Sequence, residues 1–366
     1  MKHITPRELK TKRLRLRNSD LNVQFLYSHS MICIETQHFH LNRILLLAIG
    51  LWPYPISKFV RLQIILFSGI LTSFVIFQFT AFITTKCTVD FIIKVFSTAI
   101  IFNFYVIIYN MFWINTHHVR NLLKQLQCIC NELKDENELA IIKKYGYNTR
   151  RCTAIITFLC IGGTTMTATG TMILGCFIHA CGMFHIASYR IEQAMSTKML
   201  KNINLKNQTM INKKIFYAVE IHRKAMKFID MLISSFEGSF LLLIMFCVIS
   251  LSLNIFAVFY NASLGNKEAL LLHLSFVFAI YLYMFLTNYI GQEVTNYSNN
   301  VYSTAYNVRW YMAPLHTQKM ILFILQKGSI TFDVNIAGLF VMSLQCFATL
   351  TKASMSYFTF MYSTQQ

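Results

Sequence analysis

Residues 238–266 read GSFLLLIMFCVISLSLNIFAVFYNASLGN and contain no Asp, Glu, Lys or Arg. About 20 consecutive apolar residues form a helix long enough to cross a bilayer, so this stretch can span one. Five more charge-free stretches occur, at 62–85, 95–119, 152–189, 269–292 and 334–351. The last becomes a span if Lys352 is tolerated near its middle. Because the apolar residues are continuous and do not alternate, the chain is predicted to be an all-α membrane protein and not a β-barrel.

The overall composition agrees with a membrane protein. Of 366 residues, 55% are hydrophobic and only 13% are charged, about half the share that an average soluble domain carries. This composition excludes an ordinary cytosolic enzyme, and it is too apolar for a disordered chain. The chain is nevertheless basic, with 33 Lys and Arg against 15 Asp and Glu and a net charge of +18.

The basic residues indicate the orientation of the chain in the membrane. Positive residues collect in cytoplasmic segments, and 29 of the 33 lie in 1–61, 120–151, 190–227 and 293–333. The predicted fold is therefore a seven-transmembrane helical bundle with a cytoplasmic N-terminus and an extracellular C-terminus. This orientation is the reverse of that in G-protein-coupled receptors. The basic run at 10–17 is a topology signal in this interpretation and not a nucleic-acid patch.

One stretch, 152–189, is short for the number of spans that a seven-transmembrane bundle requires of it. Residues 152–189 join two cytoplasmic segments, so they should hold two spans, spans three and four, in only 38 residues. Two spans of about 17 residues leave about four for a turn, and Gly162-Gly163 offers a break there. Either both spans are abnormally short, or one is missing and the chain has six.

Other features give no sign of catalysis. The Cys and His residues lack the spacing of a zinc site, and we expect no enzyme, metal or cofactor. Among the sequons, Asn261 falls on an outward link and is the predicted glycosylation site. The amphipathic segments 120–147 and 211–237 predict helices that continue into the cytoplasm. The segment 44–57 is predicted to be interfacial or re-entrant, with Trp52 and Tyr54 at headgroup level.

Several short motifs together resemble one family. These motifs are Gly50-Leu51-Trp52-Pro53, the segment AYNVRWY at 305–311, AGLF at 337–340 and SYFTFM at 356–361. They resemble insect odorant receptors, in particular the expanded subfamily of ants, bees and wasps, and the resemblance extends over nearly the whole chain. It implies a single domain, 1–366, of four parts: a cytoplasmic arm with the re-entrant segment (1–61), spans one to six with cytoplasmic extensions at 120–151 and 190–237 (62–292), a cytoplasmic anchor helix (293–333) and a pore-lining last span (334–366).

The resemblance also implies a function. Such a chain is a receptor in the plasma membrane of a sensory-neuron dendrite, where it pairs with a shared co-receptor, in a tetramer, as an odorant-gated, non-selective cation channel. The ligand would be a small hydrophobic volatile or cuticular compound. The implied pore and gate residues are Tyr357, Phe360 and Thr364, and the implied subunit-anchor residues are Tyr306, Trp310 and Tyr311. The candidate ligand-binding residues are Phe91, Phe96, Thr164, Met166, Phe276, Phe278 and Tyr281.

The chain departs from the family where spans three and four meet, because the long outer loop between them is absent. We therefore expect a receptor by descent with a damaged ligand pocket. Two alternatives stay open: a gustatory-receptor-type ligand-gated channel, and a secondary transporter. A transporter would show internal repeats and buried midplane charges, and the charge-free stretches argue against it.

Overall fold

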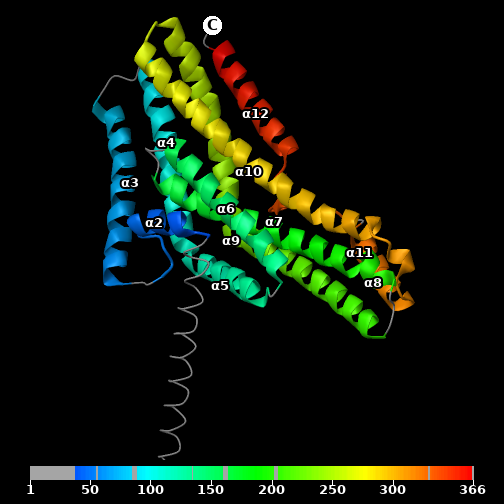
Figure 1. The fold of residues 1–366 in the computed structure, drawn as a ribbon. Coiled ribbons are helices and arrows are strands. Elements are labelled where there is room, and N and C mark those ends of the chain that lie inside the picture. Colours follow the sequence, from blue (N-terminus) through cyan, green and yellow to red (C-terminus); the bar gives the residue numbers. More distant parts are fainter. Residues whose placement is uncertain are drawn as a thin grey trace, which may run out of the picture.

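The computed structural model describes residues 38–54, 57–84, 89–133, 135–159, 164–201, 205–328 and 330–364. Nearly all of this part of the chain is helical, which confirms the predicted all-α fold, and the helices form an elongated bundle (Figure 1). The basic arm at 1–37 lies outside the described residues. In chain order the elements are α2 (His40–Ala48), α3 (Lys58–Thr84), α4 (Val89–Ile114), α5 (Thr116–Glu132), α6 (Glu136–Leu159), α7 (Thr164–Ala194), α8 (Thr197–Lys201), α9 (Leu205–Ser263), α10 (Lys267–Asn307), η1 (Trp310–Met312), α11 (Leu315–Gly328), β1 (Asn335–Ile336), β2 (Phe340–Val341) and α12 (Leu344–Ser363).

Within the described residues, four helices are long and apolar enough to cross a membrane: Lys58–Thr80, Ala168–Ala194, Lys206–Ser263 and Lys267–Asn307. The helix α9 has 59 residues, which at 1.5 Å per residue is about 88 Å. A hydrocarbon core of about 30 Å accommodates only a third of it. The N-terminal part of α9 therefore extends beyond the bilayer, as the amphipathic pattern predicted.

The helices α6 and α7 form a tight antiparallel hairpin. A side chain at Gly182 would meet Ile142 and Tyr145 of α6, and one at Gly175 would meet Thr149, so the two helices lie side by side in antiparallel register. Only eight residues of α6, 152–159, follow Arg151. They give the hairpin a height of about 12 Å above Arg151, less than half of a hydrocarbon core.

The shortness predicted for 152–189 is thus visible in the structure. The helices α4, α9 and α10 continue beyond the end of the α6–α7 hairpin toward the turn between α9 and α10 (Figure 1). Over that distance they have no cover from α6 or α7.

The helix α2 holds the hairpin in place with a buried amide. Asn42 is fully buried; its Nδ2 donates to Thr171 Oγ1 of α7 at 2.8 Å, and its Oδ1 accepts from Thr153 Oγ1 of α6 at 3.1 Å. The segment after α2 is also embedded, because Trp52 is only 3% exposed and Tyr109 of α4 donates to the Ile49 carbonyl at 2.9 Å. The protein core therefore covers the indole of Trp52, and its position at headgroup level stays a prediction.

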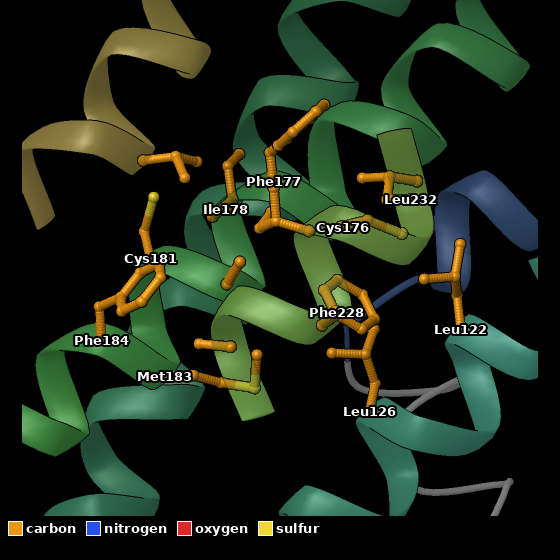
Figure 2. Packing of buried hydrophobic residues seen from close by; sticks show 14 of the residues in the cluster. Leu122, Leu126, Cys176, Phe177, Ile178, Cys181, Met183, Phe184, Phe228 and Leu232 are labelled. Atoms are coloured by element: carbon orange, nitrogen blue, oxygen red, sulfur yellow. The ribbon is translucent and has the colours of Figure 1, made fainter. Parts of the chain in front are cut away.

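The main core lies at the level of α5 and the lower parts of α7 and α9. Leu126 of α5, Phe177 of α7 and Phe228 of α9 belong to one buried cluster (Figure 2). The predicted apolar face of α5 is confirmed, because Leu122, Leu126 and Ile129 are all buried. On α9, Val219 is 41% exposed, so this one residue of the predicted apolar face points outward.

A small hairpin introduces the last helix. Strands β1 and β2 pair antiparallel, and the loop between them has positive φ at Ala337 (54°) and Gly338 (70°). Ser343 then caps α12, accepting a hydrogen bond from the Cys346 amide at 3.1 Å. The helix α12 packs on α9 through Leu350, Ser354 and Phe358.

Candidate functional site

An aromatic cavity lies between α4, α9 and α10, near the end of the α6–α7 hairpin, where a Cβ at Gly170 of α7 would lie 3.9 Å from the ring of Tyr283. Its free volume is about 50 Å³, room for one or two water molecules. Its lining residues are Phe104, Tyr105, Cys247, Ser250, Phe276, Ala279, Ile280 and Tyr283. Such a lining, apolar with a few polar groups, is typical of sites for small hydrophobic molecules.

A second cavity of about 50 Å³ adjoins the first and shares Cys247 and Tyr283 with it. This second cavity is bounded by α9 and α10 on one side and by the β1–β2 hairpin and α12 on the other. Its residues from the C-terminal segment are Ile336, Phe340, Met342, Cys346 and Leu350. The two cavities therefore form a short route from α4 to the beginning of α12.

Tyr283 separates these two spaces. Its ring meets Phe104 of α4 edge to face, with centroids 5.4 Å apart. Tyr283 and Cys247 line both cavities.

Buried polar side chains lie next to the aromatic cavity. Asn254 of α9 is fully buried; its Nδ2 donates to the Ser250 carbonyl at 2.8 Å, and its Oδ1 lies 3.0 Å from His273 Nδ1 of α10. The ring of His273 also meets Phe276 edge to face at 6.3 Å. This network fixes α9 against α10 and orients two of the lining residues.

The predicted ligand residues are only partly brought together. Phe276 lines the aromatic cavity, whereas Phe96 is 41% exposed and meets Phe79 of α3 edge to face. Phe278 and Tyr281 lie on the outer face of α10, where they line a shallow surface hollow with Leu271 and Leu274. Phe91 lies on α4, and Thr164 and Met166 lie on α7; their side chains are outside the described residues.

Sequence reasoning missed Phe104, Tyr105 and Tyr283. The residues 276, 280 and 283 have helical i, i+4, i+7 spacing, so starting from Phe276 this signal could have found Tyr283. No comparable signal marks Phe104, because α4 is apolar on every side.

The predicted pore residues lie on the free face of α12. Tyr357 is 59% exposed and Phe360 is 67% exposed, and Thr364 follows at the exposed C-cap. The opposite face, with Ser354 and Phe358, is buried against α9, where Ser252 Oγ donates to the Ser354 carbonyl at 3.0 Å.

The predicted anchor residues also lie at the surface of this chain. Tyr306 lies in the last turn of α10 and is 69% exposed, and Tyr311 in η1 is 63% exposed. Trp310 is half-buried and packs partly on the main core.

Asn261, by contrast, is 1% exposed, and its Nδ2 donates to the Ala257 carbonyl at 2.7 Å. In this conformation a glycosylating enzyme cannot reach that nitrogen, so glycosylation there would have to precede packing of α9.

Comparison with known proteins identifies similar sequences and folds. Residues 101–355 match the sequence profile of the 7tm odorant receptor family. The fold is similar to that of the insect olfactory receptor OR5 from Machilis hrabei in complex with eugenol, with a TM-score of 0.74, 15% identity and coverage of 91% of this chain and 99% of that chain. A second structure of that receptor gives a TM-score of 0.72 at 14% identity, covering 90% of this chain and 98% of that chain. No match was found among curated proteins.

Proposed function

Since the chain belongs to the odorant receptor family, it is a multi-pass membrane receptor and a ligand-gated channel subunit, and we propose that its ligand is a small hydrophobic volatile or cuticular compound. In this proposal the chain pairs with a shared co-receptor in the plasma membrane of a sensory-neuron dendrite. The assembly is a tetrameric, non-selective cation channel. The N-terminus is cytoplasmic and the C-terminus extracellular, as the basic residues predict.

The observation that carries this proposal is the position of Tyr283 between the aromatic cavity and the cavity beside α12. A ligand in the first cavity moves Tyr283, and Tyr283 moves the hairpin and α12. Tyr357 and Phe360 lie on the exposed side of α12, opposite the side that packs on α9. This supports a pore-lining role for α12, because a helix that lines a shared pore must be exposed on one side of its own subunit. The open surface at Tyr306 and Tyr311 supports their role as anchors to neighbouring subunits.

The size of the aromatic cavity predicts a weak response. Sites for drug-sized ligands have volumes of about 300–1,000 Å³, several times the 50 Å³ present here. Enlargement costs free energy, because Tyr283 and Phe104 must separate. The short α6–α7 hairpin also leaves the outer part of α10 uncovered, so a ligand in this region loses part of the enclosure that other receptors of this fold would give. We propose that this receptor responds only at high ligand concentration.

Expression with a co-receptor in cultured cells tests the proposal. Whole-cell current at a fixed holding potential is recorded while volatile and cuticular compounds are applied, and cells with the co-receptor alone serve as the reference. Ligand-evoked current that needs both chains is expected, and substrate uptake without current would indicate a transporter instead.

Tyr283→Ala should change the ligand concentration for half-maximal current at least fivefold. Phe278→Ala, on the outer face of the same helix, should leave it unchanged. A response at the sensitivity of receptors whose third and fourth spans have the usual length would exclude the damaged pocket.

A further inference from the structure

A larger cavity lies where α6, α7 and α10 meet, away from the aromatic cavity. Its volume is about 380 Å³, within the range of small-molecule sites. It shares no lining residue with either cavity at Tyr283. It is therefore a separate site, which the proposed response to odorants does not use.

The charged residues of this cavity mark one edge of the membrane. Arg151 is the last charged residue of α6 before its apolar end, and Glu293 is the first charged residue of α10 after the charge-free stretch 269–292. The two helices are level here, since Tyr145 of α6 meets Tyr297 of α10 edge to face at 5.9 Å. This placement holds whichever side of the membrane the edge belongs to.

The chemistry of the lining changes in the same order along both walls. Tyr145, Tyr297 and Glu293 form one end of the cavity. Arg151 comes six residues further along α6, about 9 Å away, with its guanidinium 5.7 Å from the Tyr147 ring centroid. Beyond it the lining is apolar, with Ile155 of α6, Leu174 of α7 and Leu286 of α10.

The end with Glu293 is suited to a cation. Glu293 is half-buried. Within the described part of the chain, the structure records no Lys or Arg in an ion pair with its carboxylate. Its Oε1 accepts a hydrogen bond from the side-chain amide of Asn296 at 3.3 Å. Faces of aromatic rings attract ammonium groups, and three tyrosines, Tyr145, Tyr289 and Tyr297, stand around this carboxylate. Arg151 supplies the fork of donors that binds phosphate oxygens.

We propose that this cavity binds one zwitterionic phospholipid of the membrane. Its ammonium group lies against Glu293 and the tyrosines, its phosphate against Arg151, and an acyl chain along the apolar end. The order ammonium, phosphate, acyl chain is the order in which such a lipid enters the bilayer. Glu293 of α10 supplies the first contact and Arg151 of α6 the second, and the lining from both helices is apolar beyond them. The bound lipid fills the groove between α6 and α10 and so supports the short hairpin from the side.

Lipid titration with native mass spectrometry tests this assignment. The full chain is purified in detergent with any subunit that accompanies it, and dioleoylphosphatidylcholine, dioleoylphosphatidylglycerol and soluble phosphocholine are added separately. The phosphatidylcholine should bind about tenfold more tightly than the phosphatidylglycerol, because only the former carries an ammonium group. Glu293→Gln should weaken phosphatidylcholine binding about tenfold, the loss of one charge-assisted contact, and should leave phosphatidylglycerol binding nearly unchanged.

Two further variants keep the test independent of folding. Glu268→Gln makes the same change at the exposed far end of α10 and should alter neither lipid's binding. Arg151→Gln, at an exposed position, should weaken both lipids to a similar degree, since both contain phosphate. Equal binding of the two lipids, no effect of Glu293→Gln, or an equal effect of Glu268→Gln would overturn the proposal. Displacement of lipid by soluble phosphocholine at the same concentration would assign the site to a soluble headgroup and not to the membrane.

Discussion

Replacing Gly291 by Ala tests how tightly the α12 segment is held by the rest of the bundle. Gly291 lies on α10 and faces Met342, the residue that follows β2. A Cβ added at Gly291 would lie 2.7 Å from the carbonyl oxygen of Met342 and 3.1 Å from its carbonyl carbon. These are backbone atoms, and Met342 is held in place because its amide donates to the Val334 carbonyl at 2.9 Å. A change of side-chain rotamer therefore cannot relieve the clash.

The size of the effect follows from these distances. To bring 2.7 Å up to the ordinary van der Waals range, which begins at 3.4 Å, the backbone at Met342 must move by at least about 0.7 Å. The Met342 Cβ, whose place the backbone also fixes, would lie closer still to the added Cβ. Overpacking of this kind costs about 1–3 kcal/mol. Replacing Gly by Ala also stabilises the helix by up to about 1 kcal/mol. This gain opposes the cost of the clash, so the unfolding free energy of Gly291→Ala alone would underestimate that cost.

Gly238→Ala supplies the matched control. Gly238 lies within α9, and no atom is within 4 Å of a Cβ placed there, so this variant receives the gain in helix propensity without the clash. The free energies of unfolding of the two variants should differ by about 1–3 kcal/mol. The corresponding difference in melting temperature, measured on the purified chain in detergent, is about 1–4 °C for a chain of 366 residues. If Gly291→Ala melted at the same temperature as Gly238→Ala, the tight packing of α10 on the α12 segment would be refuted.

Three smaller predictions concern stability, each measured as a change in melting temperature in detergent. Ala337→Gly should stabilise the β1–β2 hairpin by about 0.5–1 kcal/mol, because φ at Ala337 is 54° and left-handed backbone is costly for a residue with a Cβ; a lower melting temperature would contradict this. Asn42→Ala should destabilise the α6–α7 hairpin by about 1–3 kcal/mol, since both buried hydrogen bonds of the amide are lost, and an unchanged melting temperature would contradict it. Burial, with Arg150 and Lys143 nearby, lowers the pKa of His38 from 6.5 to about 4. The unfolded chain therefore binds more protons between these pH values, and this one group should lower stability by up to about 3 kcal/mol as the pH drops from 6.5 to 4. His38→Gln should remove this contribution, while that of His222, whose pKa burial also lowers to about 4, should stay.

The candidate site shows where sequence reasoning stopped. Phe276 was predicted as a ligand residue and lines the aromatic cavity, but Phe278, two residues away, is 64% exposed. Both are aromatic residues in a helix that is apolar all round. In water an apolar stripe marks the buried face of a helix, but in a membrane the lipid-facing side is equally apolar. Composition alone therefore cannot say which aromatic side chains meet in a cavity.

The sequence by itself determined the class of the protein and the short hairpin. Charge-free stretches predict membrane helices because a charged side chain is costly in hydrocarbon, and the 38 residues at 152–189 limit the height of α6 and α7 by length alone. The motif AGLF at 337–340 was visible, but only the tertiary structure gave its role as the turn before α12. Only the tertiary structure placed Tyr283 between two cavities and brought Glu293 and Arg151 into one cavity, because these arrangements join helices far apart in the chain. Their packing depends on shape and on hydrogen bonds between helices, which the spacing of residues within one helix does not encode.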